Sequence, residues 1–311
     1  MKRQALLHPV ADRACPGCAG RDVEHFADER LDSNKVSDFT YASRKTPEFM
    51  CLRLVRCTAC DLVFAPRPPE ENFLSQAYSE AAYDSSPEAA AAAASYAQAL
   101  APHIKQLSDL SGAVDVGAGS GPLLPYLQRF GFRSVVGVEP SRAAINAAPD
   151  AVKALLIEGM FDPQMLSGQR VSLVCSFMTL EHVANPGELV RSAYALLEPG
   201  GMLAVVVHNW RAPLNRALGL RSPIIDVEHL QLFSDTAIGA LLSSNGFQDV
   251  TVKAIRNAYP LRYWLRLTPL PAGIKAPLLR ALDLIGLSGS LLPMRVGNIM
   301  AIGVKPAREP Q

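Results

Sequence analysis

A glycine-rich segment between two apolar runs constrains the fold of this chain more than any other feature. The segment reads VDVGAGSGPLLPYLQRFGFRSVVGVEP, from Val114 to Pro140. Glycines at a turn between a strand and a helix permit positive φ angles and let backbone N–H groups approach a ligand above the strand's carboxyl end. The sequence therefore predicts a nucleotide-type binding turn at residues 117–121, with Glu139 ending the next strand.

The same segment argues against a dinucleotide site. In the fingerprint G-x-G-x-x-G the third glycine lets the helix pack closely on the strand, and a pattern that begins at Gly117 has Pro122 in that place. Asp115 stands just before the first glycine. A carboxylate there would repel a pyrophosphate but would suit a cationic ligand.

Short apolar runs alternate with helical patterns from about residue 111 to 255. The predicted strands are Ala113–Val116, Ser134–Val138, Leu155–Ile157, Ser172–Ser176, Leu203–Val207 and Asp249–Ala254, with a last strand in NIMAIGVKP near the end of the chain. The predicted helices lie near 121–130, 141–148, 187–197 and 234–245. This alternation favours an α/β fold with an open, mostly parallel sheet and helices on both faces.

The glycine motif and its acid resemble the first motif of class I S-adenosylmethionine-dependent methyltransferases. VSLVCSFMTLEHVANPGELVRSAYALLEPGGMLAVVV, at 171–207, is similar to the fourth strand, following helix and fifth strand of that family. The resemblance covers roughly residues 75–255 plus the last strand, and it implies a Rossmann-like seven-stranded sheet. It also implies S-adenosyl-L-methionine as cofactor, with the turn backbone carrying the methionine part and Glu139 accepting both ribose hydroxyls.

The third strand departs from the family pattern. Many members have Gly-Asp there, whereas this chain reads Gly159-Met160-Phe161-Asp162. We expect Met160 and Phe161 to sandwich the adenine through apolar contact, with Asp162 near its exocyclic amine. The expected cofactor-binding residues are Tyr83, Asp115, Gly117, Ala118, Gly119, Gly121, Glu139, Pro140, Met160, Phe161, Asp162 and Phe177.

Four of the six cysteines form two Cys-x-x-Cys pairs, at Cys15 and Cys18 and at Cys57 and Cys60. The start of the chain lacks the apolar centre of a signal peptide and no apolar stretch is long enough to span a membrane, so we expect a cytoplasmic protein with reduced thiols. Four thiolates then predict a structural, tetrahedral zinc site; an iron–sulfur cluster or loss of the metal are the alternatives. Ala19 and Asp61 replace the glycine that often follows such a pair.

A subset of methyltransferases begins with such a zinc module, and LRLVRCTACDLVFAPRPPEENFLSQAYSEAAYD, at 52–84, is similar to that segment. Many of these relatives act on small molecules of sugar, polysaccharide or antibiotic pathways, including nucleotide-linked sugars; another zinc-headed type methylates ribosomal RNA. Residues 1–70 contain 11 Lys plus Arg and 10 Asp plus Glu. An RNA-reading module would carry a clear positive excess, so we favour a small-molecule acceptor over nucleic acid. A non-catalytic binding protein is a third hypothesis, which the intact glycine turn and Glu139 argue against.

Candidate catalytic groups follow the predicted strands, where open parallel sheets bind ligands. They are His182, His208 and His229, each of which could titrate near neutral pH, although a structural role is an open alternative for each. His182 belongs to a stretch shared across the family, so His208 and His229 are favoured for substrate contact or proton removal. Tyr78 and Tyr83 stand where relatives place lid tyrosines.

These signals divide the chain into three expected parts. Residues 1–70 form a zinc-ribbon-like module, 71–110 a helical linker or lid, and 111–311 the methyltransferase domain. We expect a helical insertion at about 258–292 that completes the substrate pocket or makes a dimer face. Simple packing is favoured over a shallow membrane contact, which would apply to a lipid-linked substrate. The alanine-rich tract SPEAAAAAASYAQALAPHIKQL, at 86–107, is either a connector or a helix packed on the domain.

Overall fold

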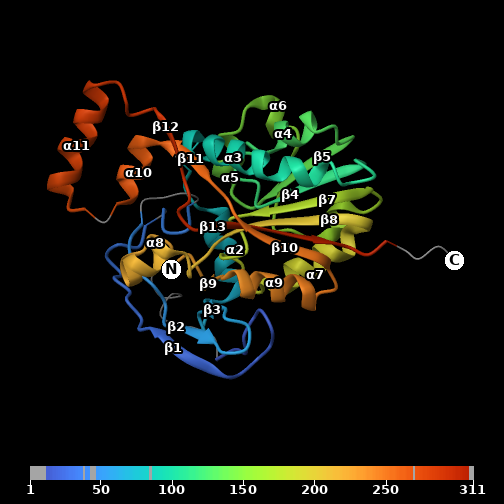
Figure 1. Ribbon diagram of the computed structural model, residues 1–311, viewed down its shortest axis with the longest axis horizontal. Helices are drawn as coiled ribbons and strands as arrows, with labels where there is room; N and C mark the ends of the chain where they lie inside the picture. The colour runs from blue at the N-terminus through green and yellow to red at the C-terminus, as the bar shows by residue number, and fades with distance from the viewer. Residues whose placement is uncertain (1–11, 38, 43–46, 84–85, 269, 308–311) are drawn as a thin grey trace.

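A seven-stranded sheet with helices on both faces forms the centre of the molecule (Figure 1). The computed structural model describes residues 12–37, 39–42, 47–83, 86–268 and 270–307. The strand order is β10-β13-β8-β7-β4-β5-β6, and β13 is the strand that runs antiparallel to its neighbours. The predicted Rossmann-like α/β fold is confirmed.

The strands of this sheet match the apolar runs of the sequence. They are β4 (Gly112–Val116), β5 (Ser134–Glu139), β6 (Leu156–Glu158), β7 (Val171–Phe177), β8 (Leu197–His208), β10 (Gln248–Ala254) and β13 (Asn298–Val304). β8 begins six residues before its predicted start, because the chain from Leu197 to Gly201 already lies against β7 through an irregular register. All residues of β4 and β7 are buried, as expected for central strands of a parallel sheet.

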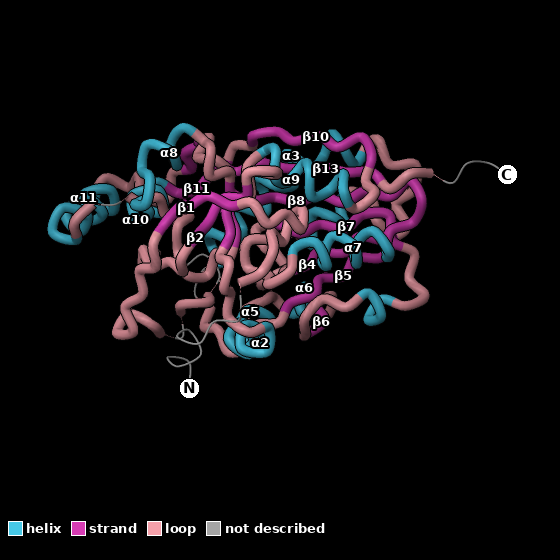
Figure 2. The backbone as a smooth tube through the Cα atoms, turned by 90° about the horizontal axis from the view of Figure 1, so that it is seen from below, coloured by secondary structure: helices cyan, strands magenta, loops and turns pink. Residues whose placement is uncertain are grey.

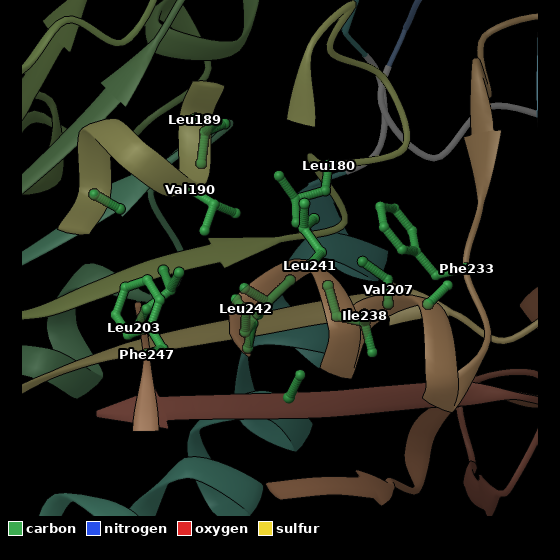
Figure 3. Close-up of a cluster of buried hydrophobic side chains, with 14 of the residues drawn as sticks. Leu180, Leu189, Val190, Leu203, Val207, Phe233, Ile238, Leu241, Leu242 and Phe247 are labelled. Carbon is green, nitrogen blue, oxygen red and sulfur yellow. The ribbon is translucent and has the colours of Figure 1, made fainter. Parts of the chain in front are cut away.

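Helices cover the two faces of the sheet and enclose two apolar cores. One core joins β7 and β8 to α7 (Pro186–Leu196) and α9 (Asp235–Ser244), where Leu189, Ile238 and Leu242 interdigitate (Figure 3). The other lies under α3 (Ser86–Ile104) and α4 (Leu124–Arg129). The alanine-rich tract is therefore a packed helix, since Ala92, Ala93 and Ala97 are buried against the sheet.

Shorter elements complete this part of the chain. They are α5 (Arg142–Asn146), α6 (Asp150–Lys153), a 3₁₀ turn at Pro163–Leu166, α8 (Pro213–Leu218) and a 3₁₀ turn at Gly219–Arg221. α8 follows β8 directly, so the loop after His208 is short and structured.

The N-terminal part forms a second, four-stranded sheet below the first (Figure 1). Its order is β1 (Val23–Ala27), β2 (Leu54–Cys57), β3 (Val63–Phe64) and β9 (Gln231–Leu232). β9 follows β8 in the chain, so the region expected to be a zinc module receives its last strand from the expected methyltransferase domain. α2 (Glu71–Ser79) then leads to the central sheet. The expected domain boundaries at 70 and 110 remain predictions.

Residues 257–295, which we call the arm, extend from one end of the molecule (Figures 1 and 2). The arm contains a two-stranded hairpin of β11 (Asn257–Pro260) and β12 (Leu291–Met294), with α10 (Leu261–Leu267) and α11 (Ala272–Leu284) between the strands. The sequence predicted the helices of this insertion but not the hairpin that carries them. Among the helices that the structure describes, none has the length and apolarity needed to cross a bilayer.

Candidate active site

A cavity of about 590 Å³ lies at the carboxyl ends of four parallel strands of the central sheet. β4 ends beside Gly117, and Glu139, Phe177 and His208 are the last residues of β5, β7 and β8. All four of these residues line the cavity. This is the edge where open α/β sheets bind ligands, and its volume suits a nucleotide-sized molecule together with a second small molecule.

The glycine turn forms one wall of this cavity. Gly117 and Gly119 have φ angles of +75° and +58°, in the left-handed region that favours glycine. A Cβ on Gly117 would lie 2.4 Å from the hydroxyl oxygen of Thr179, so only glycine fits between the turn and the loop after β7. The turn therefore brings its backbone N–H groups to the cavity with no side chain in between.

Two buried carboxylates face this turn. Glu139 accepts hydrogen bonds from the backbone N–H of Gly119 at 2.7 Å and of Ser141 at 2.8 Å. Burial raises the pKa of Glu139, and these two donors partly oppose the rise. A carboxylate offers about four acceptor positions, so Glu139 retains the capacity to accept two hydroxyl groups.

Asp115 is 5% exposed, and its pKa is raised further than that of Glu139. Desolvation by burial, together with the charge of Glu139, raises the pKa of Asp115 to about 7. Two carboxylates in one apolar setting disfavour each other's ionised form. A cation bound in the cavity would relieve this conflict, so the pair is electrostatically suited to a positively charged ligand.

The expected adenine side is only partly assembled. Met160, Phe161 and Phe177 line the cavity, as do Ala118 and Pro140. Asp162 does not: its carboxylate accepts from the backbone N–H of Gln164 at 2.9 Å and caps the short helix that follows. The acid lies two residues later than in the family's Gly-Asp pattern, and at this position it serves as the helix cap.

Gly121 also lies outside the cavity lining. A Cβ at this position would meet a methyl group of Val152 at 2.5 Å, so the third glycine serves the packing of the turn. Ser120 does line the cavity, and its hydroxyl lies 2.7 Å from the phenol oxygen of Tyr83. Sequence reasoning missed Ser120 because a serine between glycines carries no signal of its own.

The two expected lid tyrosines occupy different places. Tyr83 reaches the glycine turn, which agrees with a role at the cofactor. Tyr78 is half-buried and lines the cavity, and its hydroxyl donates to the carbonyl oxygen of His182 at 3.3 Å. Burial raises the pKa of Tyr78 well above its usual value. Tyr78 therefore forms part of the cavity wall, and a lid role for either tyrosine stays a prediction.

The three candidate histidines, far apart in the sequence, meet in the structure. The ring centroids of His182 and His229 are 4.8 Å apart, and those of His208 and His229 are 5.3 Å apart. All three line the cavity. Nδ1 of His229 is 2.8 Å from the carbonyl oxygen of Ile224, and Nδ1 of His182 is 3.2 Å from that of Glu228. Because a carbonyl only accepts, each Nδ1 carries the proton, and Nε2 is the basic nitrogen of each neutral ring.

A buried glutamate stands behind His208. Oε1 of Glu181 accepts from the backbone N–H of His208 at 2.7 Å and lies 3.2 Å from Nδ1 of its ring. Glu181 is fully buried and does not line the cavity. An ionised carboxylate in this position stabilises the imidazolium that forms when the ring takes up a proton. Sequence reasoning named the Glu181-His182 motif but did not connect Glu181 with His208.

The four paired cysteines gather at one point in the N-terminal part. The sulfur atoms of Cys15, Cys18, Cys57 and Cys60 all lie within 4.8 Å of one another. Zinc–sulfur bonds of about 2.3 Å in a tetrahedron put the sulfurs about 3.8 Å apart, so the cluster fits zinc with little adjustment. Ala19 and Asp61 follow the two pairs with φ angles of +59° and +67°. Both pairs thus keep the turn that glycine usually provides.

Hydrogen bonds connect the second cysteine pair, through Asp61, to the loop after His208. Asp61 accepts from Nε and Nη2 of Arg211 at 2.5 and 2.6 Å, and its carbonyl oxygen accepts from the indole N–H of Trp210 at 3.1 Å. The guanidinium of Arg211 also stacks on the ring of Trp210, 4.3 Å from its centroid. Burial acts to raise the pKa of Asp61, but hydrogen bonds from Arg211, Ser234 and Arg56 outweigh it and lower the pKa.

The first cysteine pair lies beside the loop that carries His182. Arg13 donates to the carbonyl oxygens of Ala65 and Ala184. Gln231 of β9 donates to those of Leu180 and Val183, the latter at 2.8 Å. The N-terminal part is therefore bound to the loop after β7, which carries His182, and to the loop that follows His208.

Comparison with known proteins agrees with this geometry. A family model described as a methyltransferase domain matches residues 83–252, more than half of the chain. The chain belongs to this family, and its resemblance to class I S-adenosylmethionine-dependent methyltransferases is confirmed. The cysteine pairs lie outside the matched segment.

Among curated proteins, several bacterial relatives carry the name ubiquinone biosynthesis O-methyltransferase. The one from Methylobacterium sp. (strain 4-46) is 33% identical over 101 residues, which are 31% of this chain and 40% of the relative. The one from Rhodopseudomonas palustris (strain BisB18) is 34% identical over 116 residues, 35% of this chain and 45% of the relative. The chain thus spans less than half of the length of either.

Solved structures that resemble the chain include an Archaeoglobus fulgidus S-adenosylmethionine-dependent methyltransferase. Its TM-score is 0.46 at 14% identity, covering 68% of this chain and 94% of that one. Another is a Haemonchus contortus phosphoethanolamine N-methyltransferase in complex with S-adenosylmethionine, with a TM-score of 0.42 at 14% identity, covering 68% of this chain and 52% of that one.

Proposed function

We propose that this protein transfers a methyl group from S-adenosylmethionine to a small-molecule acceptor. The observation that carries the proposal is the division of one cavity into two halves. The glycine turn with Asp115 and Glu139 lines it as one group, which we call the cofactor half, and the cluster of three histidines lines it as another, the acceptor half. The first half suits a cationic nucleoside, and the second suits a group that must lose a proton.

Each residue of the cofactor half has a distinct task. When bound, S-adenosylmethionine supplies an electrophilic methyl group on a sulfonium. The backbone at Gly117 and Gly119 holds the methionine end, and Glu139 accepts the ribose hydroxyls. Asp115, ionised when the cation is present, offsets its charge. Phe161 and Phe177 give apolar walls that exclude water from the site.

The histidines then position and activate the acceptor. A methyl transfer of this type needs the nucleophile in line with the breaking bond, so positioning is the main contribution of the protein. His208 is the favoured proton acceptor, because Glu181 lies 3.2 Å from its Nδ1 and stabilises the charge it gains. His182 and His229, each held by a carbonyl oxygen, orient the acceptor through Nε2.

The acceptor class follows from this half of the cavity. A nearby base is of use for a hydroxyl, and the named relatives are O-methyltransferases, so both favour oxygen as the acceptor atom. A sugar or natural-product intermediate fits this description, and so does a phenolic quinone precursor. An RNA acceptor is disfavoured because the N-terminal part is packed against the site and shows no basic excess.

The cysteine cluster completes the proposal as a structural zinc site. Such a metal requires reduced thiols, in keeping with the expected cytoplasmic location. Metal analysis should return about one zinc per chain, and Cys57→Ser should remove it and lower the melting temperature. Cys51→Ala, a buried cysteine outside the cluster, should retain the metal. A stable wild-type protein without metal would contradict the zinc site.

A direct test of the activity uses methyl donor labelled on its methyl group. The purified protein is incubated with separate panels of phenols, nucleotide sugars and hydroxylated natural-product intermediates, and with RNA as a further arm. Label should enter one of the small-molecule classes and should be lost in His208→Ala. Incorporation into RNA alone, or into no panel despite tight binding of S-adenosylhomocysteine, would contradict the proposal.

A further inference from the structure

The arm, residues 257–295, exposes an apolar surface that nothing else in the described chain matches. Of 14 large apolar side chains that are exposed in the described residues, eight lie in the arm. They are Leu270, Ile274, Leu278, Leu284, Ile285, Leu287, Leu291 and Leu292. Leu284 is 88% exposed and Ile285 65%. Such a concentration marks an interaction surface, because scattered single residues are the normal state of a protein exterior.

Several of these exposed apolar side chains lie on or directly after α11. Ile274 and Leu278 lie one turn apart on α11, and Ile285 follows directly after the last residue of the helix. α11 is the outermost element at this end of the molecule in both backbone views (Figures 1 and 2). No described segment lies beyond α11 in these views, and its exposed apolar side chains are open to solvent.

The arm also carries an excess of basic residues. It holds five of the 30 Lys and Arg residues but only one of the 29 Asp and Glu residues. The rest of the chain thus has an acidic excess, although the whole chain is close to neutral. Arg280 and Arg295 are exposed, and Arg262 pairs with the arm's single acid, Asp283, at 3.4 Å. A basic amphipathic helix is typical of attachment to an anionic membrane surface.

The base of the arm is fixed and reaches the cavity. The indole N–H of Trp264 donates to the carbonyl oxygen of Leu292 at 2.9 Å, and the rings of Tyr259 and Tyr263 are 4.6 Å apart. Tyr263 and Leu267 of α10 line the cavity. The arm thus carries the exposed apolar residues on α11 and β12, while α10 at its base contributes to the wall of the candidate active site.

We propose that the arm docks this protein onto the surface of an anionic membrane. The leucines and isoleucines of α11 and β12 enter the interface between headgroups and acyl chains, while Arg280 and Arg295 meet the headgroups. A second copy of the chain is the poorer occupant, because a symmetric contact would bring two surfaces of the same positive charge together. Docking would hold the cavity beside the lipid. Its use in supplying an amphipathic acceptor rests on the proposed function.

The test is co-sedimentation of the full chain with vesicles of two compositions. One is phosphatidylcholine with about a third phosphatidylglycerol and the other is phosphatidylcholine alone. The wild type should partition onto the anionic vesicles and much less onto the neutral ones, and high salt should weaken the binding. Leu278→Ser, Leu284→Ser and Ile285→Ser combined should lower the partition coefficient about tenfold or more. Arg280→Glu with Arg295→Glu should lower it on anionic vesicles only.

Val23→Ser with Phe39→Ser is the matched control, since both residues are apolar, exposed and outside the arm. This control should bind like the wild type. Equal binding by wild type and the triple variant, or no binding by the wild type, would overturn the proposal. So would a wild-type dimer in size-exclusion chromatography that the triple variant converts to a monomer without any vesicle binding.

Calorimetry with S-adenosylhomocysteine separates this proposal from the proposed function. The arm variants should bind it with unchanged affinity. A protein that binds vesicles but not S-adenosylhomocysteine would uphold docking and contradict the proposed function, and the reverse result would do the opposite.

Discussion

The two halves of the cavity are built in different ways. The cofactor half comes largely from one continuous stretch, in which β4, the glycine turn and β5 follow one another within 28 residues, 112–139. The acceptor half comes from separate loops after β7 and β8 and before β9, which meet only in the folded chain. A site made from one supersecondary unit can be recognised locally, whereas a site made from several depends on the whole fold.

The halves also differ in how they treat charge. The cofactor half buries two carboxylates against each other and depends on a ligand to relieve them. In the acceptor half, carbonyl oxygens lie within hydrogen-bond distance of Nδ1 of His182 and of His229, and the buried carboxylate of Glu181 lies 3.2 Å from Nδ1 of His208. We therefore expect changes in the first half to act on cofactor affinity, and changes in the second half to act on turnover.

The largest expected effect is on turnover, in the acceptor half. His208→Ala should lower kcat by about 10²- to 10⁴-fold, the range for loss of a general base. Affinity for S-adenosylhomocysteine should change little, because the ring lies in the other half of the cavity. His103→Ala, on α3 and outside the cavity, is the control. If His208→Ala weakened the affinity for S-adenosylhomocysteine as much as it lowered kcat, the division into a cofactor half and an acceptor half would be contradicted.

The next effect is on cofactor affinity and its pH dependence. The pKa of Asp115 is raised to about 7, and a cation prefers the ionised form. Affinity for S-adenosylmethionine should therefore be full above pH 7 and fall about tenfold per unit as the pH drops below it. Asp115→Asn should weaken binding about 10- to 100-fold at pH 8 and flatten the pH profile.

Calorimetry from about pH 5.5 to about pH 8 checks this, with Asp109→Asn as a control at an exposed ion pair. A wild-type profile that rises toward low pH would show that Asp115 does not act through its charge.

The smallest effect concerns the contact between the second cysteine pair and the loop of His208. Asp61→Asn weakens the bidentate contact with Arg211. It should lower kcat about three- to tenfold through a less fixed His208, with KM for the cofactor and zinc content unchanged. Glu24→Gln is the matched control, because Glu24 pairs with Arg56 but not with Arg211. An equal decrease in kcat in both variants would show that Asp61 stabilises the fold in general and does not position His208.

The sequence predicted the sheet well because its strands are short apolar runs between clear helical patterns. Where it fell short, the missing information is tertiary. β9 is two residues long and becomes a strand only because β3 lies beside it. The early start of β8 is likewise set by β7, since Pro199, Gly200 and Gly201 give no strand signal of their own.

The candidate site shows the same limit. The sequence named the glycine turn, Glu139 and the three histidines as candidates, and the structure brings them to one cavity. The sequence could not show that Glu181 lies beside His208, because 27 residues separate them and the contact joins the loop after β7 to the end of β8. Asp162 was expected at the cavity by analogy, and the local helix cap directs it elsewhere.

The proposed function depends most on Glu139, which is expected to accept hydrogen bonds from the ribose hydroxyls of a cationic methyl donor at the glycine turn. Isothermal calorimetry with S-adenosylhomocysteine on Glu139→Ala tests it most directly, with Glu158→Ala as the matched control. Glu158 lies opposite Glu139 on the neighbouring strand but pairs with Arg142 outside the cavity. Loss of two charge-assisted hydrogen bonds should weaken binding about 100-fold or more in Glu139→Ala, with Glu158→Ala close to the wild type. Wild-type affinity in Glu139→Ala would contradict the account.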